Sequence, residues 1–269
     1  MELTVAGTPA FAATGGRPFD TNLPVLVLVH GAGMDHTVWA MQARYFAHRG
    51  YSVLALDLAG HGRSAGKPLM TVEEIADWVI AVADAAGVSQ APGSISIAGH
   101  SLGAMIALET VARLGERAAA LLLLGTNNHI AVNPALLEAA QNGDHSAIEI
   151  MIGWGFGRRA QIGGHRAPGA WAAGGGLRLL EAGNLEVLAK DLAASNDYTA
   201  GLEAAARVTC RTLLVMGEDD RMTPVRTTGS LLEALGTCET MVLKGAGHMM
   251  LVEQPDETLD AMIDFLRGT

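Results

Sequence analysis

The sequence predicts an α/β domain with a mostly parallel central sheet and an inserted helical cap. Short apolar runs alternate with stretches of helical spacing, which is the pattern of parallel strands connected by helices. This alternation stops after Thr126 and resumes near residue 207, with only helical spacing between. The 269 residues are 49% apolar and 17% charged, as in a globular chain with a large core. We therefore expect residues 1–126 and 207–269 to form one core, and residues 127–206 to form a cap over it.

In the first half of the chain, strands and helices are expected to alternate. Residues 2–14 alternate weakly between polar and apolar, which predicts a hairpin at the edge of the sheet. Continuous apolar runs are typical of strands covered on both faces, and they predict strands at residues 23–29, 51–56, 95–98 and 118–124. Helical spacing predicts helices at residues 39–48, 71–86 and 104–114. Thr71 is a suitable N-cap, because its hydroxyl can accept an N–H of the first turn.

The second half begins with the expected cap and ends with the rest of the sheet. Helical spacing predicts cap helices at residues 134–141, 145–152, 177–182, 185–194 and 198–206. A glycine-rich stretch at residues 153–176 separates the second helix from the third, which favours a mobile lid. The sheet pattern then returns, with strands expected at residues 212–216 and 240–243 and helices at residues 225–235 and 257–266.

Composition argues against several classes of protein. The formal net charge of −10 argues against a nucleic-acid surface, because contacts with phosphates need clustered Lys and Arg. Cys210 and Cys238 are too few to form a disulfide framework, and we expect both to be free and buried. The N-terminus lacks the features of a signal peptide, and no apolar run is long enough to span a membrane. A cytoplasmic protein without a membrane span is therefore expected.

The segment Gly99-His100-Ser101-Leu102-Gly103 lies where an apolar strand passes directly into a helix. Such a turn forces its apex residue into a rare backbone conformation and exposes its side chain, while glycines two positions away avoid a clash. Gly-x-Ser-x-Gly in this setting is the nucleophile-elbow pattern. Ser101 is therefore the candidate nucleophile. The N–H of Leu102, at the start of the helix, is a candidate donor to an oxyanion.

A serine hydroxyl is a weak nucleophile unless a base removes its proton and a carboxylate orients that base. His248 follows the last expected strand, and Asp219 and Asp220 follow the strand before it. Open α/β sheets gather their sites at the carboxyl ends of the strands. We therefore expect His248 and one of the two aspartates to meet Ser101, and spacing alone leaves both aspartates as candidates.

These motifs resemble those of the α/β-hydrolase family over residues 23–265, most weakly in the cap. The segments that carry the resemblance are His30-Gly31-Ala32-Gly33, residues 57–64, the elbow at residues 99–103, residues 217–224 and Gly247-His248. The resemblance implies an α/β-hydrolase fold with an inserted helical cap. It assigns the roles of nucleophile, acid and base to Ser101, Asp220 and His248, and the oxyanion-hole donors to the N–H groups of Ala32 and Leu102. A serine at the elbow argues against haloalkane dehalogenase or epoxide hydrolase activity, whose relatives carry Asp there.

The resemblance implies a carboxylesterase-like serine hydrolase that cleaves a small-molecule ester through an acyl-enzyme intermediate. No cofactor and no metal is expected, and a small ester-like molecule is the expected partner. The same machinery leaves open the hydrolysis of lactones, amides, thioesters or carbon–carbon bonds and cofactor-free perhydrolysis, because a fold does not fix a substrate. A ligand-binding sensor with slow turnover is the alternative from another class. Candidate residues for the substrate pocket are His30, Gly31, His100, Trp154 and Met249.

Overall fold

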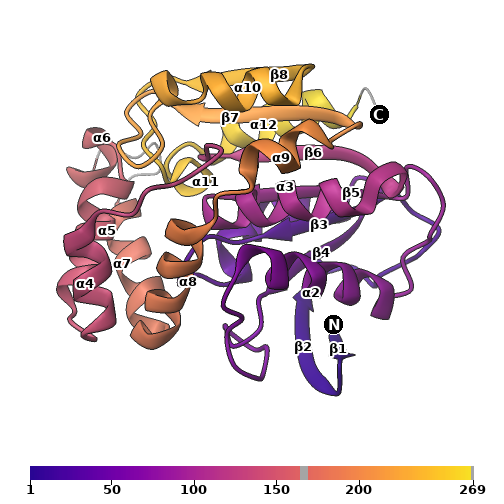
Figure 1. Ribbon diagram of the computed structural model, residues 1–269, viewed down its shortest axis with the longest axis horizontal. Coiled ribbons are helices and arrows are strands. Elements are labelled where there is room, and N and C mark those ends of the chain that lie inside the picture. Colours follow the sequence, from indigo (N-terminus) through magenta and orange to yellow (C-terminus); the bar gives the residue numbers. More distant parts are fainter. Residues whose placement is uncertain (164–168, 268–269) are drawn as a thin grey trace.

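An eight-stranded sheet forms the centre of the computed structural model, which describes residues 1–163 and 169–267. The strand order is β1-β2-β4-β3-β5-β6-β7-β8, with the N-terminal hairpin at one edge and β8 at the other (Figure 1). The hairpin strands pair antiparallel with each other and with β4, and every other pair of neighbours is parallel. The predicted α/β class with a mostly parallel sheet is confirmed.

The strands match the apolar runs of the sequence to within one or two residues. Their bounds are β1 Glu2–Val5, β2 Thr8–Ala13, β3 Val25–Val29, β4 Ser52–Asp57, β5 Ile95–His100, β6 Ala118–Leu124, β7 Arg211–Gly217 and β8 Cys238–Leu243. The central strands β3, β4 and β5 are buried along their whole length, because helices cover both faces of the sheet. The edge strand β8 is mostly exposed.

The helices outside the expected cap are α1 Ala40–Ala47, α2 Val72–Ala85, α3 Leu102–Leu114, α10 Gly229–Leu235, α11 Met250–Glu253 and α12 Pro255–Leu266. In Figure 1, α2 and α3 lie in front of the sheet and α12 lies behind it. The helix expected at residues 104–114 already begins at Leu102, without a loop after β5. The prediction of a single helix at residues 225–235 was wrong, because a separate 3-10 helix at Val225–Thr227 precedes α10. The short helix α11 was not expected.

Between β6 and β7 the described residues form helices and no strand, as predicted. The helices are α4 Pro134–Gln141, α5 Ser146–Gly155, α6 Arg158–Gln161, α7 Ala172–Ala182, α8 Leu185–Asp197 and α9 Gly201–Ala206. The stretch at residues 153–176, expected as a separator, contains the end of α5, all of α6 and the start of α7. In Figure 1, α4–α8 lie beyond the carboxyl ends of the strands, and α9 packs on α3 and α10. We call α4–α8 the cap helices, and the division at residues 127 and 206 stays a prediction.

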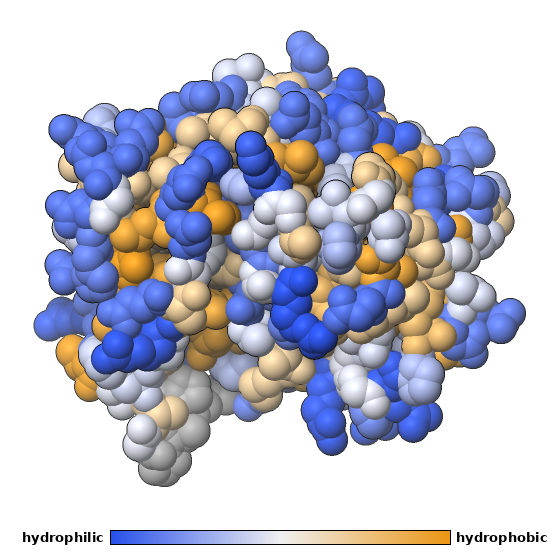
Figure 2. Space-filling view, turned by 90° about the horizontal axis from the view of Figure 1, so that it is seen from below, coloured by the Kyte–Doolittle hydropathy of each residue, from blue (hydrophilic) through white to orange (hydrophobic). Residues whose placement is uncertain are grey.

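The surface of the molecule is mixed in polarity. On the face seen in Figure 2, hydrophobic side chains appear on the left, which is the side of the cap helices in Figure 1, and also to the right of the centre. No helix among the described residues is both long enough and apolar enough to cross a membrane. Cys210 and Cys238 are free, as expected, but each is only partly buried. Burial raises the pKa of both thiols to about 11, so neither is a thiolate at neutral pH.

Candidate active site

Ser101 lies between β5 and α3 in the backbone conformation of a nucleophile elbow. Its φ is 56° and its ψ is −123°, a combination that is rare for a residue with a side chain. A Cβ on Gly99 would overlap the carbonyl group of Gly103, and a Cβ on Gly103 would overlap that of Val29. The turn therefore closes only because both positions are glycine. The N–H of Ser101 donates to the carbonyl oxygen of Leu124 at 2.9 Å, which ties the elbow to β6.

His248 and Asp220 are joined by a buried hydrogen bond between Nδ1 and Oδ2, 2.8 Å long. The same carboxylate accepts the N–H groups of Met222 and Thr223 at 2.8 and 2.9 Å and the Thr223 hydroxyl at 2.7 Å. Burial opposes ionisation of Asp220, but the attraction of His248 and these hydrogen bonds outweigh it and lower the pKa of the carboxyl group. Asp219, the other candidate acid, is exposed, and no contact joins its carboxylate to His248 in the described part of the chain.

The second ring nitrogen of His248, Nε2, is buried and has no hydrogen-bond partner among the described residues. His248 and Ser101 line the same cavity, although no hydrogen bond joins Nε2 to the Ser101 hydroxyl within residues 1–163 and 169–267. With Asp220 ionised, the proton of the neutral ring resides on Nδ1. Nε2 is then unprotonated, which is the state that a general base requires.

Two buried histidines support the loops of the site. His100 Nε2 donates to the carbonyl oxygen of His248 at 2.8 Å. Burial and the neighbouring His248 lower the pKa of His100 to about 3, so its ring stays neutral. At the end of β3, His30 Nε2 accepts the N–H of Leu58 at 3.1 Å. Burial and the charge of His61 lower the pKa of His30 to about 4. Neither ring is suited to act as a base at neutral pH.

Two backbone N–H groups beside Ser101 are available to a ligand. They belong to Ala32, in the turn at residues 30–33, and to Leu102, the first residue of α3. Among the described residues, neither group has a hydrogen-bond acceptor, and both residues line the cavity. The start of a helix is also the positive end of its dipole. The two groups can therefore stabilise an oxygen that becomes negative next to Ser101.

A cavity of about 240 Å³ lies between the carboxyl ends of the strands and the cap helices. Its walls are mainly apolar, and they include Met34, Leu136, Met151, Trp154, Phe156, Leu180, Leu192, Met222 and Met249. Among the described lining residues, Arg221 is the only one with a side chain that is charged at neutral pH. Arg221 is exposed, and its guanidinium has no ion-pair partner in the described part of the chain. The cavity thus combines an apolar interior with one available cation.

Only part of the predicted pocket lines this cavity. Trp154 and Met249 do so, whereas His30, Gly31 and His100 are fully buried and lie outside the lining. A Cβ on Gly31 would lie 3.2 Å from His100 Nδ1 and 3.3 Å from Ser101 Cβ, so Gly31 packs closely against both residues. Contact of His30, Gly31 and His100 with a substrate stays a prediction.

Asp191 of α8 is a site residue that the sequence analysis missed. Its Oδ2 accepts the N–H of Gly33 at 2.8 Å and lies 2.8 Å from His61 Nε2. A signal was present in the sequence, because Asp191 lies between Leu188 and Leu192 on the buried face of α8. A charged residue on such a face needs a partner.

Glu253 of α11 makes a second missed connection. Its Oε2 accepts the N–H of Gly157, at the start of α6, at 2.9 Å and that of Gly247, next to His248, at 3.1 Å. Burial raises the pKa of this carboxyl group despite the hydrogen bonds. The side chain joins the loop of His248 to the cap helices, and no local pattern in the sequence predicts this.

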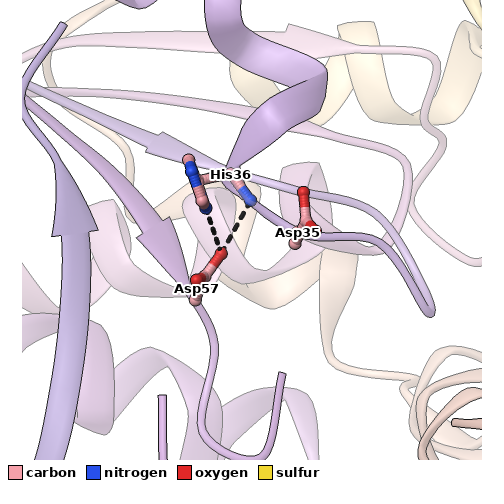
Figure 3. Close-up of side chains that lie close together, drawn as sticks. All are labelled: Asp35, His36 and Asp57. Carbon is pink, nitrogen blue, oxygen red and sulfur yellow. Dashed lines mark hydrogen bonds and ion pairs between the residues drawn. The ribbon is translucent and has the colours of Figure 1, made fainter. Parts of the chain in front are cut away.

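A cluster of possible metal ligands, Asp35, His36 and Asp57, lies outside the cavity, with its ligand atoms within 4.8 Å of one another. Figure 3 shows the ring and the backbone N–H of His36 both directed at Asp57 Oδ1, at 2.7 and 2.8 Å. Asp57 Oδ2 accepts the N–H of Arg63 at 2.8 Å. The hydrogen bond to Asp57 raises the pKa of His36. The carboxylate is thus used to hold two loops together, which makes the cluster structural.

Comparison with known proteins gives a consistent picture. The model of the alpha/beta hydrolase family matches residues 26–261. The crystal structure of an enol-lactonase from Burkholderia xenovorans superposes with a TM-score of 0.87 at 21% identity, over 99% of this chain and 100% of that chain. This likeness confirms the predicted fold.

Two curated relatives are hydrolases by name. A pimeloyl-(acyl-carrier protein) methyl ester esterase of Methylococcus capsulatus is 36% identical over 123 residues, which are 45% of this chain and 42% of the relative. The 2-hydroxy-6-oxo-6-(2'-aminophenyl)hexa-2,4-dienoic acid hydrolase of Metapseudomonas resinovorans is 24% identical over 262 residues, covering 90% of this chain and 83% of the relative. The chain spans less than half the length of several curated relatives that it matches.

Proposed function

Because the chain belongs to the alpha/beta hydrolase family, we propose that it is a serine hydrolase that cleaves small carboxylic esters through an acyl-enzyme intermediate. One observation carries the proposal. A strained Ser101, His248 and two residues whose N–H groups have no acceptor among the described residues all border one cavity, and Asp220 is hydrogen-bonded to His248. A nucleophile, an oriented base and an oxyanion hole are the parts that acyl transfer requires.

The proposed reaction has two halves. His248 Nε2 takes the proton of the Ser101 hydroxyl as the oxygen attacks the ester carbonyl, and Asp220 stabilises the resulting imidazolium. The carbonyl oxygen becomes negative and accepts the N–H groups of Ala32 and Leu102. The bond to the alcohol then breaks, and the alcohol leaves with the proton from His248. In the second half, His248 takes a proton from water as the water attacks the acyl carbon. The bond to the Ser101 oxygen then breaks, His248 returns the proton to that oxygen, and the acid leaves.

The cavity favours a substrate with a small apolar part and an anionic group. Its volume of about 240 Å³ suits a small molecule, and its interior is mainly apolar. Arg221 follows the proposed acid directly and lines the cavity, and its guanidinium has no ion-pair partner among the described residues. A guanidinium binds a carboxylate by charge-assisted hydrogen bonds. The name of the Metapseudomonas relative, an acid hydrolase, agrees with such a substrate.

A substrate panel with the variant Ser101→Ala tests the proposal. We expect the wild-type protein to turn over 4-nitrophenyl esters of short acids, and Ser101→Ala to lose activity by about 10⁴-fold or more while unfolding at the same temperature. The matched control is Ser230→Ala, the same substitution at an exposed serine of α10 outside the cavity, with activity within about threefold of wild type.

The panel also separates the rival functions. Undiminished turnover by Ser101→Ala would contradict the proposal. A single acylation without turnover would favour a sensor. Comparing kcat/KM for open-chain esters with kcat/KM for lactones and thioesters of the same acyl group decides which of the three classes the protein prefers.

A further inference from the structure

The turn that carries the proposed oxyanion donor Ala32 is held from the cap side by one carboxylate oxygen. Asp191 Oδ2 accepts the N–H of Gly33, the residue after Ala32, at 2.8 Å. Gly33 has a φ of 67°, and a Cβ there would lie 2.9 Å from the Leu188 side chain of α8. The backbone of the turn therefore packs directly on α8, one residue away from the group that would contact the transition state.

His61 supplies the countercharge for Asp191. Its Nε2 lies 2.8 Å from Asp191 Oδ2, and its Nδ1 lies 3.1 Å from the carbonyl oxygen of Ala59. Carboxylate and carbonyl oxygens only accept hydrogen bonds, so both ring nitrogens must donate and the ring must be an imidazolium. The side chains of His61 and Asp191 are 4% and 1% exposed, which makes this a buried ion pair.

The other titratable groups that face His61 agree with this charge state. Asp57 is anionic and favours the charged ring, and the ring of His30 lies 5.0 Å away. Burial also opposes the charge, but the hydrogen bond and the charge of Asp191 outweigh burial and raise the pKa of His61. His30 itself stays neutral, so it adds no repulsion at neutral pH.

A single atom of Asp191 makes both contacts. Its other oxygen, Oδ1, is buried and has no hydrogen-bond partner among the described residues. Gly33 and His61 belong to the loops after β3 and β4, while Asp191 belongs to a cap helix. Removing the acceptor at Oδ2 would therefore release α8 from two loops of the core at once.

We propose that Asp191 is a positioning residue, which fixes the N–H of Ala32 for catalysis by anchoring the turn at residues 30–33 to α8, with His61 as its counterion. This inference rests on the serine-hydrolase function proposed above. An oxyanion donor acts only when it is held close to its productive place, and a displacement of about 1 Å can reduce the rate about 100-fold.

The variant Asp191→Ala tests this role because it removes the acceptor at Oδ2. Alanine can accept neither the N–H of Gly33 nor the N–H of His61, whereas the oxygen of asparagine could accept both. We expect kcat for 4-nitrophenyl acetate to fall about 10- to 100-fold with KM within about threefold of wild type. Hydrogen exchange in peptides that cover residues 31–34, measured by mass spectrometry, is expected to become faster. The matched control is Glu186→Ala, at an exposed carboxylate on the same helix, with kcat and exchange unchanged.

The two measurements can overturn the proposal separately. A folded Asp191→Ala with kcat within threefold of wild type would overturn it, and so would a loss of kcat without faster exchange at the turn. If Asp191→Ala does not fold, His61→Gln replaces it, because glutamine can donate to Asp191 without a charge. A smaller loss of kcat with faster exchange is then expected, and no change in either overturns the proposal. If the wild-type protein hydrolyses no ester, lactone or thioester, the serine-hydrolase function fails, and exchange alone decides whether Asp191 holds the turn.

Discussion

Replacing Asp220 by asparagine would alter the proton position on His248 while keeping the shape of the site. Asp220 Oδ1 accepts two backbone N–H groups, from Met222 and Thr223, so an amide NH₂ cannot occupy that place without facing two donors. The asparagine oxygen must therefore take the Oδ1 place and its NH₂ the Oδ2 place. The NH₂ then donates to His248 Nδ1, and the ring carries its proton on Nε2. In this tautomer His248 cannot accept the proton of Ser101.

The magnitude follows from the role of the tautomer. In a serine–histidine–aspartate triad, the wrong tautomer reduces kcat about 10⁴-fold, which corresponds to about 5 kcal/mol of transition-state stabilisation. The matched control is Asp219→Asn, the same substitution at the adjacent, exposed aspartate. Its side chain does not contact His248 in the described structure, so we expect activity within about twofold of wild type.

The assay is kcat/KM for 4-nitrophenyl acetate, with a Ser101→Ala preparation as background and thermal unfolding as the test of folding. More than a tenth of wild-type activity in a folded Asp220→Asn would refute the reasoning. A greater loss in Asp219→Asn than in Asp220→Asn would move the acid to the other aspartate.

Three further predictions concern the cavity, the elbow and the buried ion pair. Arg221→Gln is expected to lower kcat/KM for the anionic ester mono-(4-nitrophenyl) glutarate about fivefold, which corresponds to about 1 kcal/mol for an exposed ion pair. For the uncharged ester 4-nitrophenyl butyrate, kcat/KM is expected to stay within about twofold of wild type. Equal losses for both esters would exclude an anion subsite. Gly103→Ala is expected to lower the free energy of unfolding by about 1–3 kcal/mol, because the new Cβ would overlap the Val29 carbonyl. Gly153 lies on α5 with open space around it, so Gly153→Ala is expected to raise the free energy of unfolding by about 0.5–1 kcal/mol. Denaturant titration measures both, and equal effects would contradict the steric account. For His61, the folded pKa is raised above the ordinary value of 6.5, so its stabilisation is complete below that value and is lost as pH rises through the folded pKa. The difference in free energy of unfolding between wild type and His61→Gln should therefore shrink as the pH rises above 6.5, and a constant difference would argue against an imidazolium.

The sequence predicts the sheet and the elbow well because both depend on neighbours along the chain. A continuous apolar run such as residues 118–124 can be buried on both faces only as an inner strand, and the structure has β6 at these residues. Gly99 predicts the strained turn at Ser101 because the clash that it avoids is with Gly103, four positions away, whereas Gly103 avoids a clash with the distant Val29. The glycine-rich stretch at residues 153–176 was expected only to separate two helices, but α7 begins inside it and includes Gly176. A Cβ at position 176 would overlap the Phe156 ring, so this helical position needs a glycine.

By itself, the sequence determined the class of fold, the position of the elbow and a short list of acids and bases, because local sterics and periodicity determine these features. Only the tertiary structure decided that Asp220 faces His248, 28 positions away, while Asp219 points to solvent. It also decided that His30 and His100 are buried outside the lining of the cavity and that Asp191 reaches Gly33 across 158 positions. The physical reason is that a contact between distant residues depends on how whole strands and helices pack. The residues next to either partner in the sequence do not determine that packing.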